Sequence, residues 1–241
     1  MSRFFRSVIG LLKLSALFLY GAIDLLIERP ATRVERAEWL HRFAGKMMRT
    51  MKISTRLEGK FPERGAIISN HMGYLDIMTY AMLHRVVFVS KAELAKVPLL
   101  GWMTTMSGTV YVERGAGGSA ERARSGIQAT AAEGIPIVFF PEGTRSRDGQ
   151  VLPFSKGPFQ LAVSEQVPIL PLVVEGSGTA LPRNSWLFGK TQDIHLRVLK
   201  AVSVDGWNLS QVAALTDSVR QRIVDELNQL RCPAAATVDK A

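Results

Sequence analysis

The stretch Ser69 to Asp76, SNHMGYLD, holds the pair of residues in this sequence that is best suited to chemistry. It follows a short apolar run and places His71 five residues before Asp76, with Gly73 between them. On a continuous helix, side chains five residues apart point about 140° away from each other, so the pair meets only if a helix begins after a break at Gly73. A carboxylate bonded to one ring nitrogen fixes the tautomer and raises the basicity of the other nitrogen. We therefore predict that His71 ends a strand and serves as a general base for a substrate hydroxyl.

One other interpretation of this histidine stays open when the pair is taken alone. It can be bonded within its own helix cap and have no catalytic role. A metal site needs more ligands than one pair, and His41, His84 and His195 do not have the spacing of metal ligands. The single cysteine, Cys232, excludes a cysteine cluster for zinc and a disulfide within the chain. We predict no metal and no bound cofactor.

A second stretch, FPEGTRSRDG at residues 140–149, also follows an apolar run directly. Gly143 allows a tight backbone path, and Thr144, Arg145 and Ser146 offer hydrogen-bond donors that suit a phosphate. A charged loop closed by an Asp-Gly turn is the alternative for this stretch by itself.

Both stretches lie in a part of the chain where short apolar runs alternate with helical patterns. The predicted strands are 66–69, 86–90, 108–112, 135–139, 169–175 and 194–199, and the predicted helices are 77–83, 119–133, 158–166 and 210–230. This alternation predicts an α/β fold, a mixed and largely parallel sheet flanked by helices, with reactive groups at the strand ends. We divide the chain into N-terminal membrane-associated helices (1–58), the α/β domain (59–232) and a flexible tail (233–241).

Composition and charge point to a folded protein with a basic N-terminal end. The 241 residues are 47% hydrophobic and 21% charged, which excludes global disorder. Residues 1–60 hold twelve basic and five acidic side chains, so +7 of the net charge of +9 lies there. Such asymmetry indicates a polyanionic partner, either nucleic acid or an anionic membrane.

Residues 8–27, VIGLLKLSALFLYGAIDLLI, decide between these partners. As a helix they span about 30 Å, the thickness of a bilayer's hydrocarbon core. Arg6, Lys13, Tyr20 and Asp24 fall on one narrow stripe of that helix, here called the polar seam. We predict a membrane helix that lies at the interface or re-enters the membrane, rather than crossing it alone. A nucleic-acid arm has no use for such a helix, and a cleaved signal peptide is disfavoured because Lys13 interrupts the apolar region.

Residues 34–51 form a second amphipathic pattern. Its apolar positions are Leu40, Phe43, Ala44, Met47 and Met51, and its basic positions are Arg36, Arg42, Lys46 and Arg49. A basic amphipathic helix beside an apolar one is typical of a membrane surface with anionic lipid. The alternative is that this helix simply packs on the core.

Taken together, the stretches resemble the glycerolipid acyltransferase family, which includes 1-acylglycerol-3-phosphate acyltransferases. The motifs that carry the resemblance are N-H-x4-D (Asn70, His71, Asp76), a strand ending in arginine (TVYVERG, Arg114), F-P-E-G-T-R-S (140–146) and V-P-I-x-P (167–171). They occur in family order, and the resemblance covers residues 70–171.

The resemblance implies acyl transfer from a thioester, acyl-CoA or acyl-carrier protein, to the free hydroxyl of lysophosphatidic acid. His71 would take the hydroxyl proton and Asp76 would orient the ring. The residues expected to bind substrate are Asn70, Lys91, Arg114, Glu142, Gly143, Thr144 and Arg145. A membrane-facing N-terminus fits this activity, because acceptor and product both lie in the bilayer. The expected location is the cytoplasmic face of the cell membrane.

Three other functions stay open. The acceptor could be another lyso-lipid, one that lacks phosphate. A membrane-surface phosphohydrolase could also use a histidine and an arginine-lined loop, and it would release inorganic phosphate without a thioester. A lipid-binding protein without catalysis would keep Arg145 but would not need the pair of His71 and Asp76.

Overall fold

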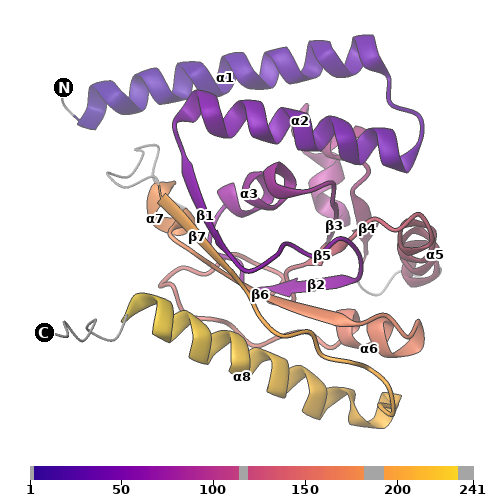
Figure 1. Ribbon diagram of the computed structural model, residues 1–241. Coiled ribbons are helices and arrows are strands. Elements are labelled where there is room, and N and C mark those ends of the chain that lie inside the picture. Colours follow the sequence, from indigo (N-terminus) through magenta and orange to yellow (C-terminus); the bar gives the residue numbers. More distant parts are fainter. Residues whose placement is uncertain (1–2, 114–118, 182–192, 233–241) are drawn as a thin grey trace, which may run out of the picture.

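A seven-stranded mixed sheet forms the centre of the molecule (Figure 1). The computed structural model describes residues 3–113, 119–181 and 193–232. The strands are β1 (Ser54–Glu58), β2 (Ala66–Ser69), β3 (Val87–Lys91), β4 (Val110–Val112), β5 (Ile137–Phe139), β6 (Ile169–Glu175) and β7 (Asp193–Val198). Their order is β1-β7-β6-β2-β5-β3-β4. All neighbours pair in parallel except β6 and β7, which confirms the predicted mixed, largely parallel sheet.

Helices cover both faces of this sheet. They are α1 (Arg3–Glu28), α2 (Arg33–Met51), α3 (Leu75–Leu83), α4 (Leu100–Met106), α5 (Ser119–Ala132), α6 (Gly157–Ser164), α7 (Ser177–Ala180) and α8 (Val212–Arg231), with short 3-10 turns at Ala92–Lys96 (η1) and Leu209–Gln211 (η2). Helices α1, α2 and α3 lie over one face, and α6 and α8 lie over the other (Figure 1).

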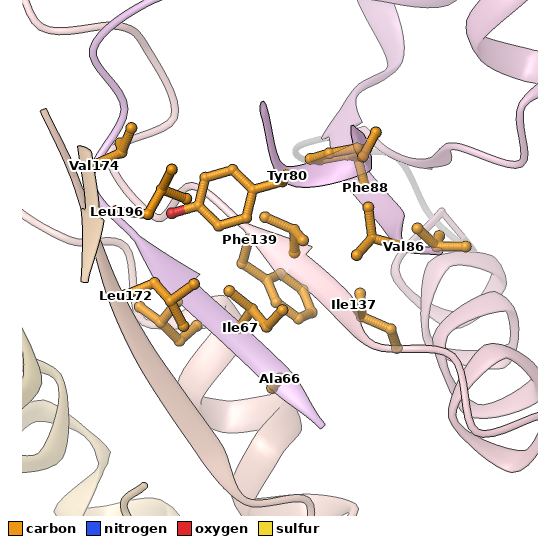
Figure 2. Close-up of a cluster of buried hydrophobic side chains, with 14 of the residues drawn as sticks. Ala66, Ile67, Tyr80, Val86, Phe88, Ile137, Phe139, Leu172, Val174 and Leu196 are labelled. Carbon is orange, nitrogen blue, oxygen red and sulfur yellow. The ribbon is translucent and has the colours of Figure 1, made fainter. Parts of the chain in front are cut away.

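The core lies on both sides of the central strands. Ile67 and Ile68 of β2 are fully buried, as is Val138 of β5, because a central parallel strand has helices on both faces and so carries apolar residues in succession. Figure 2 shows Tyr80 of α3 and Phe139 of β5 packed in this cluster. Burying the central strands in this way leaves their ends open for polar groups.

Strand β1 was not predicted from the sequence. It reads STRLE, with Leu57 as its one large apolar residue, and among the described strands it pairs with β7 alone. An edge strand buries little of its surface and tolerates charged side chains, so no apolar alternation marks it. The short η1 and α4 were missed for a related reason: five and seven residues are too few to show a helical period.

Helix α2 begins at a capping box. The Thr32 hydroxyl accepts the N–H of Glu35 at 3.2 Å, and the Glu35 carboxylate accepts the N–H of Thr32 at 3.0 Å. The five apolar positions predicted for this helix are all buried inside the protein. The alternative that this helix packs on the core is therefore what the structure shows, while Arg42, Lys46 and Arg49 of its basic face are exposed.

Helix α1 packs on α2 along one side only. Leu17 and Leu25 are buried there, and a Cβ on Gly21 would lie 2.5 Å from the Phe43 ring, so only glycine allows this close approach. The opposite side is apolar and open to solvent; it comprises Phe5, Val8, Leu11, Leu12, Leu19, Ile23, Leu26 and Ile27. Residues 7–28 are long and apolar enough to cross a membrane, with a mean hydropathy of 1.8 and 28% of the most apolar stretch buried.

Candidate active site

The ends of β2 and β5 bring the two chemical stretches together. The strands are parallel neighbours with Ile68 opposite Phe139, so the residues that follow them leave the sheet at the same edge. His71 lies two residues beyond β2, and Phe140 comes directly after β5. The two rings stack with centroids 4.1 Å apart and planes 17° apart. Phe140 therefore fixes the plane of the imidazole.

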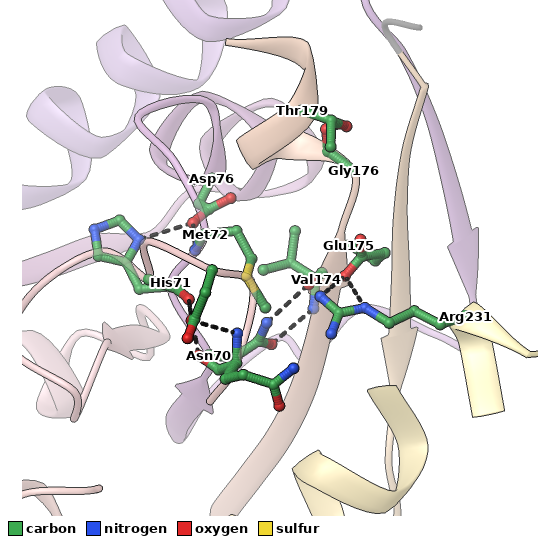
Figure 3. Close-up of polar contacts among 12 residues, drawn as sticks. Asn70, His71, Met72, Asp76, Val174, Glu175, Gly176, Thr179 and Arg231 are labelled. Carbon is green, nitrogen blue, oxygen red and sulfur yellow. Dashed lines mark hydrogen bonds and ion pairs between the residues drawn. The ribbon is translucent and has the colours of Figure 1, made fainter. Parts of the chain in front are cut away.

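His71 and Asp76 meet as the spacing predicts (Figure 3). The chain leaves the strand, turns through Gly73 and enters α3 at Leu75, and His71 Nδ1 lies 2.7 Å from Asp76 Oδ2. The same oxygen accepts the N–H groups of Met72 at 2.7 Å and Gly73 at 2.9 Å. Three donors thus converge on one carboxylate oxygen, and they hold the turn and the ring in one arrangement.

This arrangement assigns the tautomer of the histidine. A carboxylate accepts hydrogen bonds, so the Nδ1–H of His71 donates to Asp76 and Nε2 is the acceptor in the neutral ring. The Asp76 side chain is fully buried, whereas that of His71 is 15% exposed. An imidazole held by a buried carboxylate and reachable from outside is the geometry of a general base.

Asn70 ties the same segment to β6. Its side-chain amide donates to the Val174 carbonyl at 2.8 Å and accepts the Val174 N–H at 2.9 Å (Figure 3). The side chain thereby continues the pairing of β2 with β6 past the end of β2. Both polar groups of this predicted substrate-binding residue are engaged with main chain.

Glu142 joins the second stretch to the first. Its carboxylate accepts the N–H of His71 at 2.7 Å and the N–H of Leu152 at 2.9 Å, and burial raises its pKa. The His71 carbonyl accepts the Ser146 N–H at 2.8 Å. Gly143, with φ of +64°, makes the turn that lets this loop double back. Both main-chain polar groups of His71 are thus held by residues 140–152.

Arg145 and Tyr74 form the outer part of the site. The guanidinium carbon of Arg145 lies 3.6 Å from the centroid of the Tyr74 ring, and Tyr74 is 55% exposed. Stacking on an aromatic ring fixes the plane of the guanidinium, and its N–H donors lie in that plane. Thr144 is exposed beside Arg145, and Lys91 is exposed at the end of β3, the neighbour of β5.

Some site residues were not predicted, and one predicted residue lies outside the described residues. Arg114 falls in the segment 114–118, for which no structure is described. Arg220 of α8 was missed: its guanidinium donates to the carbonyls of Val151 at 2.6 Å and Leu152 at 3.0 Å. It thereby braces, from the far side of the sheet, the loop that carries Glu142. No local sequence pattern predicts this contact, because strands β6 and β7 lie along the chain between this loop and α8.

Comparison with known proteins decides the family. The model of the acyltransferase family matches residues 41–175, which hold every described residue of the site except Arg220. The chain belongs to the acyltransferase family. Among the described residues, no three His, Cys, Asp or Glu side chains are placed to hold a metal ion.

Curated members of the family align with much of this chain. A 1-acyl-sn-glycerol-3-phosphate acyltransferase of Saccharomyces cerevisiae is 28% identical over 94% of this chain and 78% of its own length. The human alpha enzyme of the same name is 30% identical over 77% of this chain and 67% of its own length. A chloroplastic relative from Brassica napus is 32% identical, but the match spans only 46% of that protein.

A solved structure shows the same fold. The crystal structure of the 1-acyl-sn-glycerophosphate acyltransferase PlsC of Thermotoga maritima superposes with a TM-score of 0.77, over 95% of this chain and 98% of that one. The two sequences are 22% identical, so the likeness concerns architecture. It extends over the N-terminal helices as well as the sheet.

Proposed function

We propose that this protein transfers a fatty acyl group from a thioester donor, acyl-CoA or acyl-carrier protein, to the free hydroxyl of lysophosphatidic acid, giving phosphatidic acid. The observation that carries the proposal is the pair of His71 and Asp76, at 2.7 Å, at the same sheet edge as Arg145. The names of the matched relatives support the acceptor. A lipid-binding protein has no need for a buried carboxylate aimed at an imidazole.

The proposed reaction is a direct transfer. The acceptor hydroxyl gives its proton to His71 Nε2 as its oxygen attacks the thioester carbonyl. The tetrahedral intermediate collapses with cleavage of the carbon–sulfur bond, and the imidazolium returns the proton to the leaving thiolate. Asp76 stabilises the imidazolium while Phe140 and the Glu142 contacts hold the ring in place.

The phosphate of the acceptor would lie on the cationic side of the site. Arg145 offers a planar fork of N–H donors, and its stacking on Tyr74 orients that fork. Thr144, Lys91 and Arg114 are proposed to contact the same phosphate. Three predicted binding residues would support the site without touching the substrate, because they shape the loops that carry His71 and Arg145. They are Asn70, Glu142 and Gly143.

We place the enzyme on the membrane through α1 and the basic face of α2, on the cytoplasmic side, where a water-soluble thioester donor reaches it. The exposed apolar side of α1 supports this placement. In this arrangement the acceptor and the product stay in the lipid layer while the donor approaches from water.

Release of free thiol from acyl-CoA, measured with and without lysophosphatidic acid, tests the proposal. We expect release that depends on the acceptor and is lost in His71→Ala by about 10²–10⁴-fold. Release of inorganic phosphate without any thioester would instead identify a phosphohydrolase. Equal rates with a phosphate-free lyso-lipid would show that the acceptor is of another class.

A further inference from the structure

A groove of about 420 Å³ lies between α1 and α2 and is lined by none of the residues assigned to acyl transfer. Arg42, Lys46 and Arg49 of α2 line it. Their spacing of four and three residues places them in one row on the helix, with neighbouring Cβ atoms about 5–6 Å apart. The groove therefore has a cationic wall.

The acidic residues of the groove are already engaged. Glu28 of α1 forms an ion pair with Arg42. Asp24 accepts the indole N–H of Trp39 at 2.8 Å and the hydroxyl of Tyr20 at 3.4 Å. Within the described residues no carboxylate pairs with the two remaining cations of the wall. These two cations are available to an anion.

The two cations are also positioned. The Lys46 ammonium lies 3.4 Å from the centroid of the Tyr20 ring. The Arg49 guanidinium folds back over Gly45, where an added Cβ would lie 3.2 Å from Nη1. The missing side chain at Gly45 thus makes room for the guanidinium at the floor of the groove. An ammonium and a guanidinium that line one hollow suit the oxygens of a phosphate.

We propose that this groove binds the phosphate of an anionic phospholipid of the membrane on which the protein rests. Leu19 lies at the centre of the exposed apolar side of α1. Tyr20 belongs to the polar seam and lies about 100° around the helix axis from Leu19. A lipid whose acyl chains lie along that side would carry its headgroup at the level of the seam. Tyrosine and lysine favour this depth, where the apolar body of the side chain meets lipid and its polar end meets water.

The proposal goes beyond acyl transfer, since the bound lipid is neither the acceptor nor the product undergoing reaction. It is tested by the affinity of the full chain for vesicles of neutral phosphatidylcholine and for vesicles in which part of it is replaced by phosphatidic acid. Three variants are compared with the wild type: Lys46→Gln, Lys13→Gln and Gly45→Leu. Lys13 is an exposed cation of the same seam that does not line the groove, so it is the matched control for loss of one charge.

We expect Gly45→Leu, which fills the groove without changing the charge, to weaken binding to anionic vesicles about tenfold or more, the loss of one charge-assisted hydrogen bond. Its binding to neutral vesicles should be unchanged. Lys46→Gln should show at least the same loss, and Lys13→Gln no more than about fivefold, the effect of one exposed charge near anionic lipid. All three variants should release thiol at the wild-type rate in detergent micelles that contain saturating lysophosphatidic acid but no bilayer lipid, which separates this site from the proposed function.

Two results would overturn the proposal. The first is an equal loss in Lys46→Gln and Lys13→Gln, or wild-type binding by Gly45→Leu, because attraction to the membrane would then depend on charge alone. The second is binding of inorganic phosphate that Lys46→Gln removes while the variants bind vesicles alike, which would show a site for free phosphate. If Gly45→Leu lacks a thermal unfolding transition, the comparison of Lys46→Gln with Lys13→Gln decides.

Discussion

Replacing Asp76 by asparagine tests whether the buried carboxylate stabilises a charged imidazole. The asparagine oxygen can still accept from His71 and from the two main-chain N–H groups now bonded to Oδ2. What is lost is the negative charge opposite the imidazolium that forms during proton transfer. At an effective dielectric constant of about 20, two unit charges about 4 Å apart interact by about 4 kcal/mol, of which a neutral hydrogen bond keeps about 1 kcal/mol.

The expected loss is therefore about 3 kcal/mol in the transition state, or roughly 100-fold in kcat. The variant should also unfold more easily, by about 1–3 kcal/mol, because the new NH₂ group would take the place of Oδ1, which is buried and has no hydrogen-bond partner among the described residues. The rate is measured as acceptor-dependent thiol release for the wild type, Asp76→Asn, His71→Ala and the double variant. In the His71→Ala background, Asp76→Asn should cost nothing further. A near-normal rate in Asp76→Asn, or an equal loss in both backgrounds, would refute the reasoning.

Three further predictions concern the surrounding residues. Arg145→Lys keeps the charge but loses the fork, so the KM for lysophosphatidic acid should rise about tenfold while that for a phosphate-free lyso-lipid stays unchanged; equal changes would make Arg145 structural. Burial raises the pKa of Glu142 above 4.5, so the native state binds this proton more tightly than the unfolded chain, and wild-type stability should fall relative to Glu142→Gln as pH rises from about 4.5 towards neutrality. Thermal midpoints of both proteins across this range check it, and parallel curves would contradict it. Asn70→Ala leaves the N–H and the carbonyl of Val174 buried without their hydrogen-bond partner, so it should cost about 2–4 kcal/mol of unfolding free energy in a urea titration. A loss below about 0.5 kcal/mol would contradict the anchoring role.

The sequence predicts those parts of the site whose residues lie close together in the chain. The break at Gly73 is visible in eight residues, and it requires His71 and Asp76 to meet across a strand-to-helix turn, as they do. The apolar runs that bury central strands are likewise visible, because each run is dictated by helices on both faces of the sheet.

The roles that sequence did not reveal depend on distant partners. Asn70 bonds to a residue 104 positions away, and Glu142 bonds to one 71 positions away, so no pattern around either residue shows that its polar atoms meet main chain. The polar composition of Asn70, Glu142 and the residues of β1 suggests exposure or ligand contact. Their place in the fold gives them main-chain partners instead.

The pairing of β1 with β7 has a consequence for the order of events during synthesis. Ser54 and Asp193 are partners across 139 residues, so at a synthesis rate of about 5–20 residues per second β1 waits on the order of ten seconds for β7, its one neighbour among the described strands. Throughout that interval α1 and its apolar side have left the ribosome, whereas the sheet beneath them is incomplete. We expect the nascent chain to settle on the membrane before the domain closes, and ribosome-bound chains stalled ahead of Asp193 should already sediment with vesicles. Chains that stay in solution until β7 is made would show the reverse order, in which a finished domain docks afterwards.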